Sequence, residues 1–255
     1  MKHPSRSEHL RAAGPLDSQQ ERSYELQHQG ELVFTGDSEN PTVEKFLRLK
    51  TKLSHGQLAA LKTILITSPV PGDGKSTISM NLALAFATNI ETPTILIDCD
   101  LRRPSIHTFM RPTPSLGLAG VLRGETNFTN ALCRIEGTNL HLLPTVSRMP
   151  DPLETLASSR FTHLLSMIKE SYARIIIDTP PIVPFSDADA LGSQVDGVII
   201  VTRAGVTPKH LYQRAIESLQ SAPLLGTVLN GSQPNLIDRG HKDVGYYYDY
   251  YRKKR

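Results

Sequence analysis

The stretch Thr63–Ala87 reads TILITSPVPGDGKSTISMNLALAFA, and it decides the fold. It begins with five residues typical of a buried strand, passes through a turn with two glycines and ends in a helical run. Gly72 and Gly74 let the backbone turn tightly, so that N–H groups of the loop and helix start can bind phosphate oxygens. Lys75 is expected to reach the terminal phosphates, and Ser76 to place its hydroxyl on Mg²⁺.

One position of this loop departs from the general pattern G-x-x-x-x-G-K-[ST], because Pro69 stands where the first glycine belongs. A chance G-K-S-T in an ordinary strand, turn and helix is the alternative. The apolar strand before the loop and the helix after it weigh against that alternative, since the motif requires this context. The predicted ATP-binding residues of the loop and helix start are Pro71, Gly72, Asp73, Gly74, Lys75, Ser76 and Thr77.

On both sides of this stretch, short apolar runs alternate with longer periodic segments. Continuously apolar strands separated by helices indicate a mostly parallel central sheet with helices on both faces. The predicted fold class is therefore α/β, with the P-loop NTPase fold. The predicted strands are 63–67, 94–98, 140–144, 174–178, 197–201 and 226–231, and the predicted helices are 42–53, 75–88, 154–170 and 208–220.

Three aspartates follow apolar strands in the motifs TILIDCDLRRP and RIIIDTPP. Asp98 and Asp100 are two residues apart, so in extended chain they point to the same side, while Cys99 points away. Asp178 ends another strand. Ligands of open α/β sheets bind beyond the carboxyl ends of the strands, so these carboxylates can converge on Lys75. A lone aspartate after a strand is more often a helix cap, but three beside a phosphate loop indicate a Mg-nucleotide site.

Composition divides the chain of 255 residues into a globular body and two flanks. Residues 1–40 are rich in Ser, Gln, Arg and Glu with sparse apolar residues, so we expect a flexible N-terminal segment. The body, 41–235, is the predicted nucleotide-binding domain, and 236–255 form a flexible tail. Hydrophobic residues make up 39% of the chain, which suits a soluble globular protein.

Charge, cysteine content and hydropathy limit the possible functions. The net charge of +3 does not imply nucleic acid as a partner. The two cysteines, Cys99 and Cys133, cannot form a disulfide framework, which favours a reducing cytoplasm, and Cys133 is expected to be a small buried residue. We find neither an apolar run approaching 18 residues nor a signal-peptide core. The expected location is cytoplasmic.

The C-terminal sequence GYYYDYYRKKR holds five of the eight tyrosines of the chain. Side chains of three adjacent residues cannot share one buried face in a strand or a helix, so a buried cluster is disfavoured. The segment also ends in four basic residues, and chain termini are often poorly ordered. We therefore expect an exposed tail, whose phenols are Tyr246, Tyr247, Tyr248, Tyr250 and Tyr251.

The combination of PGDGKST, ILIDCDLRRP, IIIDTPP and a tyrosine-rich tail resembles the bacterial tyrosine kinases (BY-kinases) of capsule and exopolysaccharide export systems. The resemblance runs from about Glu44 to Arg255. Each motif alone is shared with other P-loop ATPases, whereas the combination is specific. The resemblance implies an ATP-dependent protein-tyrosine autokinase that phosphorylates its own tail and regulates the chain length and export of the polysaccharide.

The resemblance also assigns roles within the site. It implies that Lys75 binds the β- and γ-phosphates, that Ser76 and Asp100 hold Mg²⁺, and that Asp178 assists through the metal's water shell. Asp98 is implied to lie nearest the incoming phenol as its base or orienting group. Because an ordinary carboxylate is a weak base for a phenol, orientation and late proton acceptance are the expected contributions.

Four further positions near the predicted site also have expected roles. Arg102 and Arg103 follow the acidic pair and are candidates for phosphate or subunit contacts, with Arg102 the predicted catalytic residue. Asn230 resembles a base-contacting position of related ATPases, although Asn before Gly is also common in turns. Val70 stands where ATPases that partition chromosomes and place division sites carry an extra lysine, which favours the kinase branch.

The segment EKFLRLKTKL partly matches a family motif of the type E-x-x-R-x-x-R used for ring assembly. It keeps Glu44 but has Leu47 and Lys50 where arginines are usual. Lysine cannot reproduce a bidentate arginine contact, so ring formation is less firmly predicted than nucleotide binding. The resemblance nevertheless implies a homo-oligomeric ring.

The resemblance further implies two protein partners and a location. These are a membrane-anchored polysaccharide co-polymerase or activator on a separate chain, and a phosphotyrosine phosphatase. The chain is then expected at the inner face of the cell membrane, held there through its partner. Two other classes stay open from the sequence: an ATPase switch of the spatial-regulator type, and a nucleotide-gated scaffold whose tyrosines only bind partners.

Overall fold

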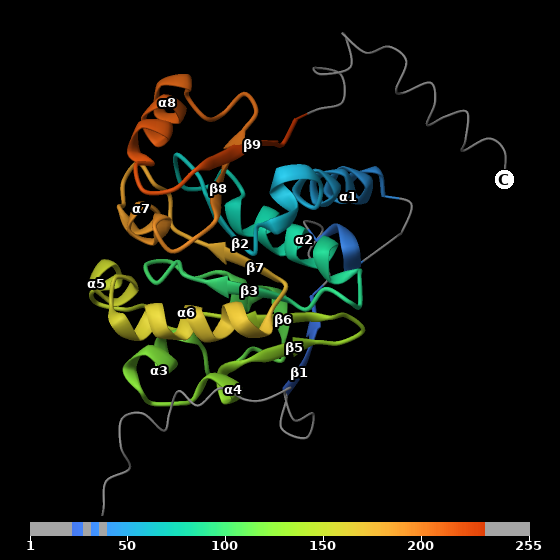
Figure 1. The fold of residues 1–255 in the computed structure, drawn as a ribbon, viewed down its shortest axis with the longest axis vertical. Coiled ribbons are helices and arrows are strands. Elements are labelled where there is room, and N and C mark those ends of the chain that lie inside the picture. The colour runs from blue at the N-terminus through green and yellow to red at the C-terminus, as the bar shows by residue number, and fades with distance from the viewer. Residues whose placement is uncertain (1–21, 28–31, 36–39, 233–255) are drawn as a thin grey trace, which may run out of the picture.

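The computed structural model describes residues 22–27, 32–35 and 40–232 of the chain. The described strands form one sheet with helices on both faces (Figure 1), in the order β4-β1-β5-β6-β3-β7-β2-β8-β9. Neighbouring strands are parallel except in the pairs β1/β4 and β5/β6. The strands are β1 (Arg22–Leu26), β2 (Thr63–Thr67), β3 (Thr94–Asp98), β4 (Met110–Arg111), β5 (Cys133–Ile135), β6 (Leu140–Leu143), β7 (Arg174–Asp178), β8 (Gly197–Arg203) and β9 (Leu224–Asn230).

Eight α-helices and three short 3-10 helices connect or flank the described strands. The α-helices are α1 (Pro41–Leu53), α2 (Lys75–Ala87), α3 (Leu118–Arg123), α4 (Phe128–Ala131), α5 (Pro152–Leu156), α6 (Ser159–Ser171), α7 (Asp187–Gly192) and α8 (Lys209–Ser218). The 3-10 helices are η2 (Val33–Thr35), η3 (Gly56–Ala60) and η4 (Ile106–Phe109). The predicted α/β class with a mostly parallel sheet is confirmed.

Side chains of the central strands alternate between the two faces of the sheet. In β2, Ile64 and Ile66 belong to the core shared with α1 and α2, whereas Leu65 belongs to the core shared with α3 and α5–α8. The same alternation recurs in β3, β7 and β8. A strand with two buried faces has no polar side to show, which is why these runs are apolar throughout.

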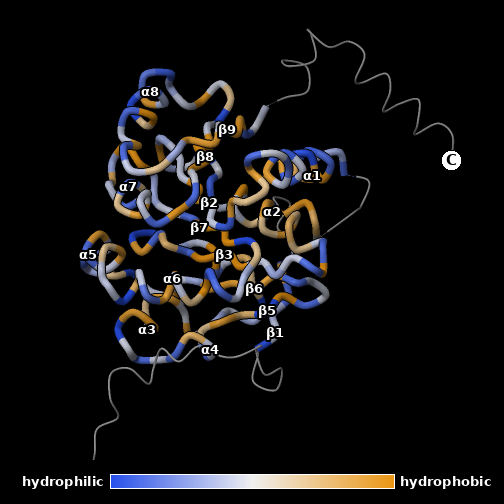
Figure 2. Tube along the Cα trace, viewed as in Figure 1, coloured by the Kyte–Doolittle hydropathy of each residue, from blue (hydrophilic) through white to orange (hydrophobic). Residues whose placement is uncertain are grey.

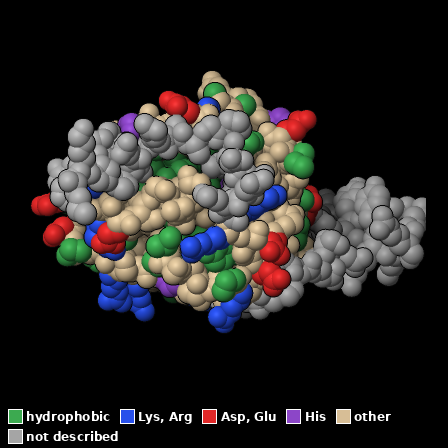
Figure 3. All heavy atoms as spheres, turned by 90° about the horizontal axis from the view of Figure 1, so that it is seen from below, with side chains coloured by type: hydrophobic (Ala, Val, Ile, Leu, Met, Phe, Trp, Pro, Cys, Tyr) green, Lys and Arg blue, Asp and Glu red, His purple; other side chains and the backbone are tan. Residues whose placement is uncertain are grey.

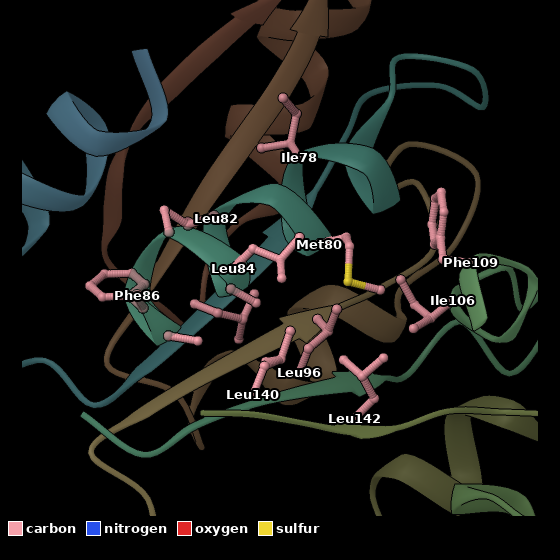
Figure 4. Packing of buried hydrophobic residues seen from close by; sticks show 14 of the residues in the cluster. Ile78, Met80, Leu82, Leu84, Phe86, Leu96, Ile106, Phe109, Leu140 and Leu142 are labelled. Atoms are coloured by element: carbon pink, nitrogen blue, oxygen red, sulfur yellow. The ribbon is translucent and has the colours of Figure 1, made fainter. Parts of the chain in front are cut away.

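Helix α2 lies in the middle of the core that it shares with α1 on one face of the sheet. Figure 4 shows Met80 and Leu84 of this helix against Leu96 of β3 and the β6 residues Leu140 and Leu142. From Ile78 to Ala87 every residue of the helix is buried. Replacing such a buried leucine by alanine typically costs about 2–5 kcal/mol of stability. This burial anchors α2, and with it the first turn of the helix, which follows the phosphate loop directly.

The second face is covered mainly by α6. Phe161, Leu164, Leu165 and Ile168 recur at the helical spacing and are all buried. The hydroxyl of Ser158 accepts a hydrogen bond from the N–H of Phe161 and caps the helix. This cap separates α5 from α6, so the single helix predicted over 154–170 is wrong and two helices are found.

The N-terminal flank differs from the flexible segment that composition predicts for residues 1–40. Residues 22–26 form β1, which pairs with β5 and β4 at the edge of the sheet and buries Tyr24. Val33 is buried, and its N–H donates to Oδ1 of Asn81 at 2.9 Å. Pairing with distant strands stabilises this polar segment, and local composition does not reveal such pairing. Tail residues 236–255 lie outside the described residues.

Hydropathy follows this architecture. In Figure 2 the apolar parts of the trace gather at the central strands and α2, while hydrophilic parts lie outside. On the face seen in Figure 3, basic, acidic and apolar side chains are interspersed, in keeping with the mild net charge of +3. None of the helices in the described ranges has the length and apolarity needed to cross a membrane.

Candidate active site

A cleft of about 1030 Å³ opens beyond the carboxyl ends of β2, β3 and β7. Four groups of residues line it, one of which is Arg203, Asn230 and Gly231 at the ends of β8 and β9. The phosphate loop contributes Pro71, Gly72, Gly74, Lys75, Ser76 and Thr77. Opposite the loop, the residues that follow β3, β6 and β7 contribute Asp100, Arg102, Arg103, Arg148 and Phe185, and the N-terminal part contributes Val33, Asn40, Thr42 and Phe46.

The phosphate loop adopts a shape that its two glycines permit. Gly72 and Gly74 have φ values of +89° and +92°, in the left-handed region that favours glycine. A Cβ on Gly74 would overlap the side-chain amide of Asn230, whereas one on Gly72 would meet open space. Gly74 therefore serves both the turn and the close approach of β9.

The side chain of Asp73 is turned into the protein and stabilises the loop, while the predicted binding of nucleotide by this residue stays a prediction. The residue is 1% exposed, and its carboxylate accepts hydrogen bonds from the hydroxyl of Thr207 at 2.6 Å and the N–H of Val70 at 3.3 Å. The side-chain amide of Asn230 donates to the carbonyl of Asp73 at 2.9 Å. Asn230 also lines the cleft, so one side chain ties the loop to the sheet edge and borders the predicted nucleotide site.

Lys75 is the centre of a buried charge cluster. Its Nζ lies 3.0 Å from Oδ2 of Asp100, 3.6 Å from Oδ2 of Asp178 and 3.1 Å from Oγ of Ser76. Burial alone would lower the pKa of Lys75, but the charges of Asp178 and Asp100 outweigh it and hold the pKa above its ordinary value. Lys75 therefore stays charged, as a phosphate-binding lysine requires.

Asp178 accepts hydrogen bonds on both of its oxygens. Ser76 donates to Oδ2 at 2.6 Å, and Ser79, one turn along α2, donates to Oδ1 at 2.9 Å. Burial raises the pKa of Asp178, and the charge of Lys75 together with the two serines offsets only part of that rise. Of the three carboxylates predicted to converge on the loop holding Lys75, Asp100 and Asp178 lie within 4 Å of its ammonium group.

The oxygen atoms of this cluster suit a hard divalent cation. Mg²⁺ prefers oxygen ligands and is usually bound by one or two carboxylates together with substrate phosphates. Ser76, Asp100 and Asp178 supply a hydroxyl and carboxylates of that kind beside Lys75. Within the described ranges no three His, Cys, Asp or Glu side chains group into a metal site.

Asp98 lies behind the cleft rather than on its surface. The residue is fully buried, and its carboxylate accepts hydrogen bonds from the N–H groups of Asp100, Ser105 and Ile106 at 3.1–3.2 Å. Burial and the neighbouring Asp178 raise the pKa of Asp98 to about 8. Asp98 thus shapes the loop after β3, and its role toward a phenol stays a prediction.

The arginines of the opposite wall have different partners. Nε of Arg102 lies 3.0 Å from Oδ2 of Asp187, a fully buried carboxylate, and its guanidinium stacks 4.3 Å from the centre of the Phe185 ring. Arg103 and Arg148 line the cleft with exposed side chains. Sequence reasoning named the first two arginines but missed Arg148 and Asp187, because neither stands in a recognisable motif.

Some predicted residues are not brought into the site. The phosphoacceptor candidates Tyr246, Tyr247, Tyr248, Tyr250 and Tyr251 lie outside the described residues. Cys133 is buried, as predicted, in the core beside β1. The side chain of Lys50 donates to the hydroxyl of Thr88 at the end of α2, so this position of the partial ring motif contacts the same chain.

Comparison with known proteins places this site in a family. A model of the AAA domain matches residues 61–218. The chain is 33% identical over 207 residues to the tyrosine-protein kinase YwqD of Bacillus subtilis, covering 80% of this chain and 85% of the relative. It is 32% identical to the tyrosine-protein kinase CpsD of Streptococcus agalactiae, covering 76% of this chain and 85% of that protein.

Solved structures agree with these relatives. The chimerical protein CapA2B2 has a TM-score of 0.74 at 29% identity, covering 80% of this chain and 91% of its own. The kinase domain of VpsO has a TM-score of 0.68 at 33% identity, covering 75% and 95%. The cell division ATPase MinD of Pyrococcus furiosus, at 22% identity and a TM-score of 0.55, shares the fold alone. The chain belongs to the bacterial tyrosine-protein kinase (BY-kinase) family.

Proposed function

We propose that this protein transfers the terminal phosphoryl group of ATP to the tyrosines of its own C-terminal segment. The observation that carries the proposal is the cluster that joins Lys75 and Ser76 of the phosphate loop to Asp100 and Asp178 at the ends of β3 and β7. Membership of the tyrosine-protein kinase family supports a phenol as the acceptor. Five tyrosines in the last ten residues supply phenols within the same chain.

The residues of the site divide the work of such a transfer. Phosphoryl transfer depends mainly on positioning and on neutralising charge. Lys75, kept charged by its carboxylate neighbours, neutralises the terminal phosphate oxygens, and the backbone of the phosphate loop orients them. A bound Mg²⁺, held by Ser76, Asp100 and Asp178, would add further neutralisation of the phosphate charge.

The reaction balances with one proton to place. The phenol oxygen forms a bond to the terminal phosphorus, the bond from that phosphorus to the bridging oxygen breaks, and ADP leaves. Asp98, with a pKa of about 8, matches a phenol better than an ordinary carboxylate does, but it is buried behind the loop that it shapes. We assign Asp98 to orienting the loop and, in the molecules whose Asp98 carboxylate is ionised, to late proton acceptance, and we assign Arg102 to contacting substrate phosphate.

The wider setting of this activity is part of the proposal. We place the domain at 41–235 and a tyrosine-cluster tail at 236–255, and we propose control of exopolysaccharide or capsule chain length and export. An activator on a separate, membrane-anchored chain and a phosphotyrosine phosphatase are the proposed partners. We also propose a homo-oligomer, although Lys50 contacts Thr88 of its own chain. Light scattering of the purified chain tests the oligomer directly.

Labelling with γ-labelled ATP followed by peptide mapping tests the proposed function. We expect label on the C-terminal peptide in the wild type and its near-complete loss when all five tail tyrosines become phenylalanine. Binding of Mg-ATP should stay nearly unchanged in that variant, since the tail takes no part in the phosphate loop. Release of inorganic phosphate without labelled protein would favour an ATPase switch, and label confined to residues 41–235 would overturn the tail as acceptor.

A further inference from the structure

The lining of the cleft holds more basic than acidic side chains. Its titratable lining residues are one acid and five bases, namely Asp100, Lys75, Arg102, Arg103, Arg148 and Arg203. Lys75 is paired with Asp100 and Asp178, and Arg102 is paired with Asp187. Arg203 donates to the carbonyl of Gly72 in the phosphate loop at 3.3 Å.

Arg103 and Arg148 are different from these three. Both side chains are exposed, and across the described residues neither has an ion-pair partner within 4 Å. They come from loops far apart in the sequence. The hydroxyl of Thr145 donates to the carbonyl of Asp98 at 2.7 Å, and the N–H of Met149 donates to the carbonyl of Leu101 at 3.0 Å. Those two bonds fasten the loop bearing Arg148 against the loop bearing Arg103.

Arg103 and Arg148 lie on the side of the cleft from which we expect the acceptor to approach. The phosphate loop holds the donor phosphates from one side, and in-line transfer requires the acceptor oxygen to approach from the other side. Arg103 follows the carboxylates of β3 on that other side, and its N–H donates to Oδ1 of Asp100 at 2.8 Å. Exposed arginines at the rim of such a site are suited to bidentate contacts with carboxylate or phosphate groups.

We propose that Arg103 and Arg148 are specificity-determining residues that hold an anionic group beside the tyrosine being phosphorylated, and that this group is a phosphotyrosine already present in the acceptor segment. The inference rests on the proposed function. In an extended tail, residues two apart lie on the same side, so a phosphate on Tyr250 accompanies Tyr248 into the cleft. Arg252–Arg255 are repelled by the same rim, so the first transfer is the slowest and later ones are faster.

Two synthetic peptides test this inference. Both span residues 244–255 with Tyr248 as the acceptor and phenylalanine at the other tyrosines, and one carries phosphotyrosine at position 250 instead. The enzyme is the full chain with its five tail tyrosines changed to phenylalanine, so that its own tail does not compete. We expect kcat/KM about tenfold higher for the phosphorylated peptide, since each exposed charge contact contributes about threefold.

Six further variants of that enzyme test which residues cause the preference. Arg103→Gln and Arg148→Gln should each lower the preference about threefold. The double variant should abolish the preference, Lys at either position should retain part of it, and the KM for ATP should not change. Arg214→Gln, an exposed arginine of α8 away from the cleft, should leave the preference intact. The preference should also shrink as salt rises.

The outcomes separate this inference from the proposed function. Transfer to both peptides without a preference, or a preference that survives in the double variant, overturns the inference alone. No transfer to either peptide overturns the proposed function and the inference with it. A second measurement, independent of turnover, is the affinity of the labelled phosphopeptide by fluorescence anisotropy in the presence of ADP, which the double variant should weaken about tenfold.

Discussion

The two walls of the cleft are built in different ways. The phosphate-loop wall comes from one continuous stretch, 71–77, and nearly every polar side chain near it is hydrogen-bonded or ion-paired. The opposite wall is assembled from loops after β3, β6 and β7, and two of its arginines are exposed. In the proposed function the continuous, internally bonded wall fixes the donor phosphates, and the assembled wall with its exposed arginines selects the acceptor.

Replacing Lys75 by methionine is the most drastic change to the first wall. We expect tail phosphorylation to fall at least about a thousandfold, because the terminal phosphate loses its neutralising partner. The fold should persist, since burial already raises the pKa of Asp178 and this carboxyl can take up a proton when its cation is gone. Incorporation of labelled phosphate and circular dichroism measure the two effects.

Lys209→Met is the matched control, because Lys209 is an exposed lysine at the start of α8. That variant should retain full activity. If the Lys75→Met protein were phosphorylated on tyrosine as fully as the wild type, Lys75 would not be an active-site residue. The proposed role of the phosphate-loop wall would then be wrong.

The carboxyl of Asp98, behind the second wall, gives the stability of the metal-free protein a pH dependence. Its pKa of about 8 in the folded protein lies above the ordinary value of 3.8, so the folded state holds a proton that the unfolded chain releases. That contribution is complete below about pH 4 and is lost as the pH rises to about 8. The loss amounts to at most about 1.4 kcal/mol per pH unit.

Asp98→Asn removes this proton, so its unfolding free energy should depend less steeply on pH between 5 and 8. Urea unfolding at four pH values measures the slopes, and the slopes rather than the absolute stabilities are compared, because asparagine also weakens the bonds to the loop N–H groups. Asp178, whose pKa is also raised, should leave a residual slope. If the unfolding free energies of the wild type and the variant had the same dependence on pH, Asp98 would not be the group that binds this proton.

The ion pair of Arg102 and Asp187 holds the second wall together. Arg102→Gln leaves a fully buried carboxylate without its cation, and we expect a loss of about 2 kcal/mol in unfolding free energy, reduced from the fully buried case because Arg102 is 30% exposed. The exposed pair of Arg123 and Glu125 is the control, and Glu125→Gln should cost clearly less stability, because solvent screens this pair. Equal losses would mean that burial of Asp187 adds nothing.

The two glycines of the loop offer the finest comparison. Gly72→Ala and Gly74→Ala both force alanine into the left-handed region, at about 1–2 kcal/mol each. Only Gly74→Ala also meets Asn230, so it should weaken ATP binding several-fold more than Gly72→Ala. Adding Asn230→Ala should recover part of that difference. Titration with a fluorescent ATP analogue measures the affinity of each variant. Identical affinities of Gly72→Ala and Gly74→Ala would mean that the contact with Asn230 does not affect ATP binding.

The same contrast explains what could be predicted from sequence. Strands 63–67, 94–98 and 174–178 were predicted with the bounds that β2, β3 and β7 have, because two buried faces make a strand apolar throughout. The phosphate loop and its carboxylates were predicted because their chemistry lies in continuous motifs. Their convergence follows from the parallel sheet.

Residues whose role depends on distant partners were not predictable. β1 has only Tyr24 buried, and its strand state comes from pairing with β5 and β4. Arg148 reaches the cleft through bonds from its loop to Asp98 and Leu101, and no local pattern marks it. Asp187 resembles any acidic residue at a helix start until its burial against Arg102 is seen.

The order of the strands in the sheet also determines when each strand can pair during biosynthesis. β2 leads into the phosphate loop, yet its neighbours in the sheet are β7 and β8. The ribosome must therefore add about 110 residues after β2 before its first partner exists, which takes roughly 6–22 s at typical elongation rates. During that interval the strand has no native sheet neighbour. We expect the nascent chain to acquire affinity for nucleotide only after Asp178 has been made.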